Sequence, residues 1–397
     1  MPDAILALNA GSSSIKFALF DRGPGLAPRV RGEMEGIGTA PHFIAQDPAG
    51  KTLMEKSWPN RSTDHDALLG WLLEWVEGHL GDATLAAVGH RVVHGGRDFT
   101  APVRLTADIV AALDRLTPLA PLHQPPSLAL VRTIMALQPA LPQTACFDTA
   151  FHHTLPAVAT RFALPREYED EGVRRYGFHG LSYEFIARRL TELAPGLARC
   201  RIVVAHLGNG ASLCAMQDGR SVDTTMGLTA LDGLVMGTRC GSLDPGVVLY
   251  LLQEKGLSAT EIETLLYKRS GLLGVSGLSS DMRTLVASPD IRAREAIELF
   301  VFRIAQETAL LAASMGGLDG FVFTAGIGEH APEVREAVCE RLRWLGVRMD
   351  KAANAACATH IGEPGSSVAV MVIPTDEEAM IARHTEEVLA PAGGSRV

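Results

Sequence analysis

Apolar residues in this chain are grouped in two ways, and each way predicts a different kind of element. Short apolar runs, rich in valine, isoleucine, leucine and phenylalanine, have the length and composition of buried β-strands. They lie at 5–8, 15–20, 86–93, 202–207, 321–324 and 368–373. Apolar positions at helical spacing fill 291–315 and 332–345, and Pro332 suits the first turn of a helix. Because both kinds of segment are mixed along the chain, the pattern predicts an α/β fold.

The first two apolar runs flank a turn that is rich in small, hydrogen-bonding residues. The segment reads LNAGSSSIKF, with Gly11, Ser12, Ser13 and Ser14 between the runs and Lys16 shortly after them. A hairpin of this kind can direct backbone N–H groups toward an anion, and the lysine adds a positive charge. We interpret it as a phosphate-binding turn, with an ordinary serine-rich hairpin as the alternative. It is not a Walker loop, because the chain contains no GxxxxGK[ST].

Two further glycine-rich segments extend this interpretation. VVAHLGNGASLCAMQDG, at 203–219, repeats the strand, turn and strand of the opening AILALNAGSSSIKFALFDRG. The repeat predicts a duplicated domain, with chance as the alternative because the similarity is short. TAGIGEH, at 324–330, is expected to be a tight turn between a strand and a helix, where backbone can approach a nucleotide closely. An ordinary loop at this position is the alternative.

Composition narrows the classes of function. The chain has 397 residues, of which 47% are apolar, so two domains with sizeable cores are expected. Its net charge of −9 gives no electrostatic reason to expect nucleic acid or an anionic membrane as a partner. We find no signal-peptide pattern and no apolar run long enough to cross a membrane. The six scattered cysteines form no CxxC pair and are typical of reduced thiols, which predicts a cytoplasmic protein. The histidines lack the spacing of a transition-metal site.

Four polar residues in glycine-rich or aromatic segments are candidates for chemistry. Arg91 in GHRVVHGG and Arg239 in MGTRCGSLDPG can each clamp a carboxylate or phosphoryl group, although loop arginines usually form surface salt bridges. Asp148 follows the strand-like run 144–147, and His179 lies in the loop YGFHG. A helix cap is the alternative role for Asp148, and a packed loop histidine is the alternative for His179.

The segment PTDEEAM follows the last predicted strand. Thr375 and Glu378 fit a capping box, and that structural role is sufficient for Glu378. Glu377 is in addition a candidate magnesium ligand, either directly or through water.

Ten motifs, in one order and covering nearly the whole chain, resemble a known family. They are NAGSSSIKF, GHRVVHGG, APLHQPP, FDTAFH, YGFHG, HLGNGAS, MGTRCG, the triplet DMR at 281–283, FTAGIGEH and PTDEE. In them the chain resembles the acetokinase family, the acetate kinases of the acetate and sugar kinase, Hsp70 and actin superfamily. No single motif decides this resemblance, but the ordered set is specific.

The resemblance implies an architecture and a reaction. The implied fold is α/β, with duplicated actin-like (ribonuclease H-like) domains around a nucleotide cleft. One domain spans 1–150 and is completed by a C-terminal helix at about 376–397, and the other spans 151–375. The implied reaction is reversible phosphoryl transfer from ATP to acetate, giving ADP and acetyl phosphate, with Mg²⁺ (or Mn²⁺) as the metal. The family is generally homodimeric, and the implied substrates are small molecules.

The resemblance also implies roles for individual residues. The metal-associated residues are Asn9 and Glu377. The catalytic residues are Asp148 as the catalytic acid, with His179 and Arg239 as stabilisers of the transition state. The substrate-binding residues are Arg91, Val93, Leu122, Phe178 and Ala230. The nucleotide-binding residues are Lys16, His206, Leu207, Gly208, Asn209, Gly210, Asp281, Met282, Arg283, Gly326, Ile327, Gly328, Glu329 and His330.

Physical chemistry refines these roles. A carboxylate substrate is already ionised at pH 7, so it needs no general base. The difficulty is to bring one anion up to a polyanion, which demands positive charge and alignment. On this argument Arg91 holds the acetate, while Arg239 and His179 stabilise the transferred group. Asp148 is then better suited to orienting an arginine or a magnesium-bound water than to transferring a proton.

The chain departs from the common family pattern at two positions. Ala230 stands where a proline usually forms one wall of the pocket for the acetate methyl group. A smaller wall leaves room for one more methylene, which a pocket distinguishes by only about 1–3 kcal/mol, so propionate is expected to be an appreciable substrate. A propionate or butyrate kinase is therefore the nearest alternative, and an actin-like or Hsp70-like ATPase without kinase activity is a distant one. Tyr183 stands where a histidine is common, and we expect a structural role for it.

Overall fold

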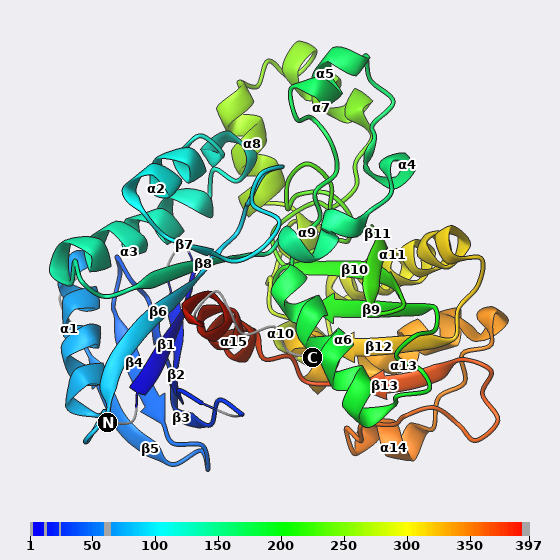
Figure 1. Cartoon of the computed structure of the whole chain (residues 1–397). Helices are drawn as coiled ribbons and strands as arrows, with labels where there is room; N and C mark the ends of the chain where they lie inside the picture. Colours follow the sequence, from blue (N-terminus) through cyan, green and yellow to red (C-terminus); the bar gives the residue numbers. More distant parts are fainter. Residues whose placement is uncertain (1–2, 12–13, 24, 59–64, 391–397) are drawn as a thin grey trace. The chain divides into compact units, whose positions relative to one another are not determined.

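The structure is a computed structural model that describes residues 3–11, 14–23, 25–58 and 65–390 (Figure 1). Ser12 and Ser13, which the sequence interpretation placed in a phosphate-binding turn, lie outside these residues. The described residues divide into two compact units. The first contains the residues up to Ala150 and those from Asp376 onward, and the second is Phe151–Thr375. No described helix is long and apolar enough to span a membrane.

The first unit is built on an eight-stranded sheet in the order β5-β4-β3-β2-β1-β6-β8-β7. Its strands are β1 (Asp3–Ala10), β2 (Ile15–Asp21), β3 (Pro28–Glu35), β4 (His42–Gln46), β5 (Thr52–Ser57), β6 (Thr84–Val92), β7 (Val103–Arg104) and β8 (Gln143–Phe147). The opening hairpin pairs β1 and β2 antiparallel, whereas β6 and β8 run parallel to β1. The carboxyl ends of β1, β6 and β8 therefore meet at one edge of the sheet.

Helices cover this sheet and bring the end of the chain back to its beginning. They are α1 (His65–Gly78), α2 (Ala107–Asp114), α3 (Gln124–Leu137) and α15 (Glu377–Leu389), with a 3₁₀ turn at Thr117–Leu119. Leu72 of α1 and Ile134 of α3 share an apolar core with alternate residues of β1. The last helix, α15, packs against β1, β6 and β8, and its dark red ribbon lies beside the first strands in Figure 1. Gly89 permits this approach, because a Cβ there would lie 2.2 Å from Thr385 Oγ1.

The second unit is built on a five-stranded sheet in the order β11-β10-β9-β12-β13. Its strands are β9 (Ile202–Leu207), β10 (Ala211–Gln217), β11 (Arg220–Thr224), β12 (Gly320–Thr324) and β13 (Ala369–Val372). Its helices are α4 (Ala157–Thr160), α5 (Arg166–Asp170), α6 (Gly180–Leu193), α7 (Pro245–Gln253), α8 (Ala259–Lys268), α9 (Gly271–Ser276), α10 (Met282–Ala287), α11 (Ile291–Met315), α12 (Ala325–His330), α13 (Pro332–Arg341) and α14 (Lys351–Ala355), with 3₁₀ turns at Ala150–Thr154 and Arg343–Leu345. Tyr183 and Ile186 of α6 pack on Val204 of β9, and α11 packs against β9, β10 and β11.

The two sheets share a five-stranded arrangement. β3-β2-β1-β6-β8 in the first sheet and β11-β10-β9-β12-β13 in the second have the same order. Their directions also agree, since the first two pairings are antiparallel and the last two are parallel in both. The shared order supports the duplication that the sequence predicted from its repeated hairpin. The α/β fold class with two related halves is therefore correct.

Two local predictions were wrong. The segment at 325–330 is the short helix α12 rather than a turn, and the buried Arg335 donates to the carbonyls of Gly328 and Glu329 near its end. Those bonds supply partners for carbonyls that a helix terminus leaves unpaired. The cap of α15 is Asp376, whose carboxylate accepts the Ala379 N–H at 2.9 Å, so Thr375 and Glu378 form no capping box. Thr375 instead donates its hydroxyl to Ser182.

Candidate active site

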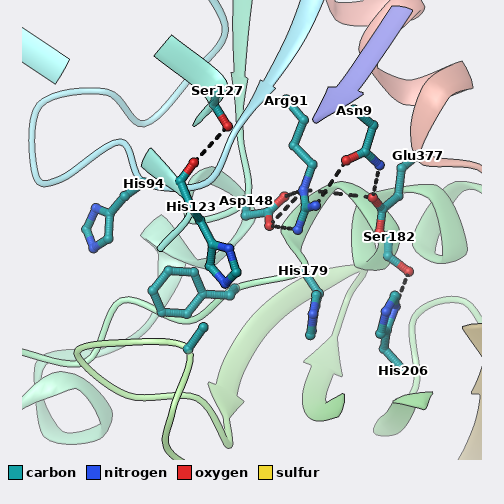
Figure 2. Close-up of polar contacts among 12 residues, drawn as sticks. Asn9, Arg91, His94, His123, Ser127, Asp148, His179, Ser182, His206 and Glu377 are labelled. Carbon is teal, nitrogen blue, oxygen red and sulfur yellow. Dashed lines mark hydrogen bonds and ion pairs between the residues drawn. The ribbon is translucent and has the colours of Figure 1, made fainter. Parts of the chain in front are cut away.

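In the first unit, Arg91 and Asp148 form a buried ion pair at the carboxyl edge of the sheet. Arg91 lies near the end of β6, and Asp148 directly follows the neighbouring parallel strand β8. Arg91 Nε lies 3.0 Å from Asp148 Oδ1, and Arg91 Nη2 lies 2.5 Å from Asp148 Oδ2 (Figure 2). Asp148 is only 1% exposed, so this two-point contact with a cation stabilises its buried charge. Both oxygens of Asp148 face the guanidinium.

Asn9 and Glu377 complete the cluster from opposite ends of the chain. Arg91 Nη1 donates to Asn9 Oδ1 at 3.0 Å, and Asn9 Nδ2 donates to Glu377 Oε2 at 2.9 Å. Glu377 Oε2 also lies 3.9 Å from Arg91 Nε. Burial alone would lower the pKa of Arg91, but the charges of Asp148 and Glu377 raise it well above its usual value. The guanidinium is therefore a permanent cation held in one orientation.

The hydrogen bonds of Arg91 leave a defined part of its guanidinium for a ligand. A guanidinium has five N–H groups. The contacts with Asp148 and Asn9 use three of them, namely the one on Nε, one on Nη1 and one on Nη2. Among the described residues, one N–H on each terminal nitrogen thus has no protein acceptor. Two such groups match the two oxygens of a carboxylate.

Lys16 and Glu378 line a small cavity of the first unit. Lys16 pairs with Asn9 across the β1–β2 hairpin, and both residues therefore point to the same face. Lys16, Arg31 and Glu378 line a cavity of about 210 Å³. Burial, followed by the charge of Glu377, raises the pKa of Glu378. Lys16 is exposed and supplies the opposing positive charge at this cavity.

In the second unit, two histidines stack with their ring centroids 4.2 Å apart and their planes 15° apart. His179 precedes α6, and its φ of +58° lies in the left-handed region that non-glycine residues seldom adopt. His206 lies on the buried strand β9. Both residues are buried, each with 8% of its surface exposed. The His179 ring therefore lies against the strand that carries His206.

His179 and Arg239 converge on the glycine turn after β9. A Cβ at Gly210 would lie 3.3 Å from His179 Nε2 and 3.4 Å from Arg239 Nη2. Arg239 Nη1 is fixed by the carbonyl of Ala230 at 2.8 Å. The loop that carries Arg239 is compact, since a Cβ at Gly271 would meet Met236 O at 2.2 Å. A neutral or charged N–H donor and a guanidinium thus face the same small volume, as stabilisation of a phosphoryl group requires.

A cavity of about 690 Å³ in the second unit is lined by residues from three of the predicted nucleotide-binding segments. The predicted residues that line it are Gly208, Asn209, Asp281, Met282, Arg283, Gly326, Ile327 and His330. Its other lining residues, which the sequence interpretation missed, are Ser280, Val286, Ala287, Ala331 and Glu333. The apolar Val286 and Ala287 belong to α10 beyond the DMR triplet, and helical spacing from Met282 was the available signal.

The remaining predicted nucleotide residues do not line this cavity. Leu207 is a fully buried core residue of β9. Gly328 lies inside α12 against Phe323. Glu329 accepts the backbone N–H of Thr375 at 3.1 Å, which ties α12 to the segment before α15.

Of the four residues predicted to line the methyl pocket, two belong to each unit. Val93, directly after β6, is 3% exposed, and Leu122 lies in the loop before α3; both belong to the first unit. Phe178, 1% exposed, and Ala230 belong to the second unit.

The two residues predicted to associate with the metal could offer it only oxygen ligands. No group of three or more histidine, cysteine, aspartate or glutamate side chains arranged for a metal was found among the described residues. Asn9 and Glu377 contribute an amide and a carboxylate, which suit Mg²⁺ rather than a softer metal. Mg²⁺ usually takes few protein ligands and completes its shell with water and substrate phosphates, so this sparse set fits it.

Comparison with known proteins gives matches over nearly the whole chain. The model of the Acetokinase family matches residues 4–383. An acetate kinase of Rhodopseudomonas palustris is 56% identical over 390 residues, covering 97% of this chain and 98% of that protein.

Solved structures match over the same length. A propionate kinase from Francisella tularensis superposes with a TM-score of 0.89 at 38% identity, covering 96% of this chain and 98% of that one. An acetate kinase from Porphyromonas gingivalis superposes with a TM-score of 0.85 at 38% identity, covering 98% of this chain and 100% of that one.

Proposed function

The chain belongs to the acetokinase family, and on that premise we propose that it transfers the terminal phosphoryl group of ATP reversibly to acetate. The products are acetyl phosphate and ADP. The observation that carries the proposal is the 56% identity to an acetate kinase over 97% of the chain. An actin-like or Hsp70-like ATPase without kinase activity has no need of the Arg91–Asp148 pair or of the His179 and Arg239 donors.

Arg91 acts as the acceptor-binding residue. Its two remaining N–H groups, one on each terminal nitrogen, receive the two oxygens of the acetate. Asp148 and Asn9 hold the guanidinium in that orientation, at 2.5–3.1 Å and 3.0 Å respectively. Because both oxygens of Asp148 are bonded to Arg91, we assign Asp148 an orienting role rather than a proton transfer.

His179 and Arg239 act on the transferred group. Both residues present N–H donors beside Gly210, where a Cβ would lie 3.3 Å from His179 Nε2 and 3.4 Å from Arg239 Nη2. They stabilise the equatorial oxygens of the phosphoryl group, where charge is spread in the transition state. We assign ATP to the cavity of about 690 Å³, with Asp281 to Arg283, Gly326, Ile327 and His330 contributing to its binding.

Mg²⁺ would be held by Asn9 and Glu377, and bound there it would neutralise phosphate charge. Lys16 would add a positive charge beside these residues. Mn²⁺ has similar ligand preferences and is expected to substitute for it. We also propose that the protein is cytoplasmic and that it forms a homodimer. The cytoplasmic location is supported by the six cysteines, none of which lies in a disulfide.

A carboxylate series tests the proposal. Purified protein, ATP and Mg²⁺ are incubated with acetate, propionate or butyrate, and the acyl phosphate is trapped with hydroxylamine and measured. We expect acetate to give the highest kcat/KM and propionate to follow, because one methylene is worth about 1–3 kcal/mol. A higher kcat/KM for propionate or butyrate would replace acetate as the substrate. ATP hydrolysis without any acyl phosphate would refute carboxylate kinase activity altogether.

A further inference from the structure

His179 is connected to the interior of the second unit through two hydroxyl groups. Its Nδ1 lies 2.8 Å from Ser212 Oγ, and Ser212 Oγ lies 2.5 Å from the hydroxyl of Tyr183. Ser212 belongs to β10, and Tyr183 belongs to α6, four residues beyond His179. We call this chain of three groups the Tyr183 relay. Both hydroxyl residues are fully buried, at 0% exposure, so they exchange no hydrogen bonds with bulk solvent.

The number of protons in the Tyr183 relay limits the state of the histidine. Tyr183 brings one proton, Ser212 brings one, and Nδ1 of His179 brings one or none. Two hydrogen bonds join the three groups, so they use two protons. If Nδ1 carries no proton, Tyr183 donates to Ser212, Ser212 donates to Nδ1, and every group is satisfied. If Nδ1 carries a proton, one buried O–H has no acceptor among the described residues, which is unfavourable.

Tyr183 keeps its proton under all ordinary conditions. Burial, aided by the nearby Cys214, raises the pKa of the tyrosine well above its usual value. It therefore remains a donor, and Ser212 is its acceptor. A hydroxyl that accepts one hydrogen bond becomes a stronger donor of its own proton, which favours the bond to Nδ1.

We propose that the Tyr183 relay holds His179 as a neutral imidazole whose proton is on Nε2. Tyr183 and Ser212 are then positioning residues that act through His179. The Nε2–H faces Gly210, beside Arg239, where it can donate to an oxygen of a phosphoryl group. A second cation at this point would be repelled by the guanidinium of Arg239, whereas a neutral donor is not. The site thus separates the two functions, with Arg239 supplying charge and His179 supplying a directed hydrogen bond.

His206, stacked on His179, has a relay of the same form. Its Nδ1 lies 2.8 Å from Ser182 Oγ, which accepts the hydroxyl of Thr375 at 2.9 Å. Ser182 is 0% exposed. Because Ser182 accepts the hydroxyl of Thr375, its own proton is available to Nδ1, which favours Nε2–H for His206. Two parallel neutral rings then stack without the repulsion of two imidazolium ions. The agreement of two independent relays strengthens the assignment for His179.

The tautomer of His179 can be measured directly. In ¹⁵N spectra of protein labelled at its histidines, the protonated and unprotonated nitrogens of a neutral ring have well-separated shifts. The His179 signals are identified by their loss in His179→Gln. We expect the wild-type protein at pH 7.5 to show an unprotonated Nδ1 and a protonated Nε2. A protonated Nδ1, alone or with a protonated Nε2, would overturn the proposal.

Variants of the relay test whether the tautomer affects the reaction, and this step rests on the proposed function. Ser212→Ala removes the donor to Nδ1, so we expect both tautomers and a kcat lower by about 10-fold with little change in the KM for acetate. Tyr183→Phe leaves Ser212 as a weaker donor, so a loss of about threefold in kcat is expected. Unchanged tautomer and kcat in Ser212→Ala would contradict the positioning role.

A control variant distinguishes the positioning role of Ser212 and Tyr183 from the general effect of removing a buried hydroxyl group. Thr308 on α11 is fully buried and donates to Ile304 O at 2.7 Å, so Thr308→Val removes a comparable group elsewhere in the unit. We expect its kcat and histidine spectra to match those of the wild-type protein. The tautomer does not depend on activity. A wild-type spectrum with Nε2–H in a protein that forms no acyl phosphate would support the relay and refute the proposed function instead.

Discussion

The two units stabilise their candidate site residues in different ways. In the first unit, the guanidinium of Arg91 is held by the carboxylates of Asp148 and Glu377, so charge is balanced by charge. In the second unit, His179 and His206 are held by hydroxyl groups that carry no charge. The proposed roles account for this difference. A residue that binds an anionic acceptor should be a permanent cation, whereas a hydrogen-bond donor beside Arg239 needs only the right direction.

The largest effect is expected from removing the cation of the first unit. Arg91→Ala should lower kcat/KM for acetate by about 100-fold or more, because a preorganised donor pair is lost. It should also lower the free energy of unfolding by about 3–5 kcal/mol, since the buried charge of Asp148 is no longer balanced by a guanidinium. Denaturant unfolding and acyl phosphate assays measure the two losses.

An exposed arginine supplies the matched control for this substitution. Arg132 pairs with Asp114 at the surface, where both side chains are nearly half exposed. Arg132→Ala should change the free energy of unfolding by at most about 1 kcal/mol and leave kcat/KM unchanged. Activity of Arg91→Ala within threefold of the wild-type value would refute the acceptor-binding role.

The next effect concerns the partner that orients Arg91. Asp148→Asn replaces one accepting oxygen by an NH₂ group that faces the guanidinium. The two-point contact that orients Arg91 is then lost. We expect kcat/KM for acetate to fall on the order of 10- to 100-fold, mainly through KM. The pH dependence of kcat/KM should keep its shape. If the variant instead loses a titration that the wild-type protein shows, Asp148 transfers a proton and the orienting role is wrong.

A smaller effect is expected from the wall of the methyl pocket. Ala230→Val adds bulk at the position that we expect to admit an extra methylene. It should lower the ratio of kcat/KM for propionate to that for acetate by about 10-fold. An unchanged ratio, measured in the same carboxylate series, would mean that Ala230 does not contact the acyl chain.

The smallest effect on activity is expected from His90, which adjoins Arg91 on β6 but is kept neutral. Burial lowers the pKa of His90 from 6.5 to about 4, and the hydrogen bond to Gln143 opposes this only partly. The unfolded chain therefore binds a proton near pH 6.5, whereas the folded chain binds it only near pH 4. Stability from this group is complete above pH 6.5 and is lost as the pH falls from 6.5 to 4.

His90→Gln tests this interpretation by unfolding measurements across the same pH range. The wild-type protein should lose on the order of 2–3 kcal/mol more than the variant between the two limits. At pH 7.5 the two proteins should have similar kcat. Equal losses on acidification would show that His90 does not titrate differently in the folded and unfolded states.

The amino-acid sequence was sufficient to predict the strands and helices that depend on the local pattern of apolar residues. The continuous apolar run at 202–207 predicted β9 at its observed bounds, and helical spacing over 291–315 predicted α11. Arg91 and Asp148 were identifiable because each follows or ends a predicted strand. Their contact could not be derived, since it requires β6 and β8 to be neighbours.

The features that sequence reasoning missed depend on residues far apart in the chain. Ser212 and His179 are 33 positions apart, and Thr375 and Ser182 are 193 apart, so no spacing rule links them. The cap of α15 was misassigned because Thr375 has a distant partner that local pattern does not show. The helix α12 was expected as a turn because its glycines disfavour helix, while Arg335 and packing on β9 stabilise it.

The most direct test of the division between the two units is a comparison of Arg91→Ala with Arg239→Ala in acetyl phosphate formation. Initial rates are measured over acetate and ATP concentrations with excess Mg²⁺, so that kcat and both KM values are obtained. We predict that Arg91→Ala raises the KM for acetate and leaves the KM for ATP nearly unchanged. We predict that Arg239→Ala lowers kcat by about 100-fold with a smaller change in the KM for acetate. Equal effects of the two substitutions on every parameter, or wild-type rates in both, would contradict the account.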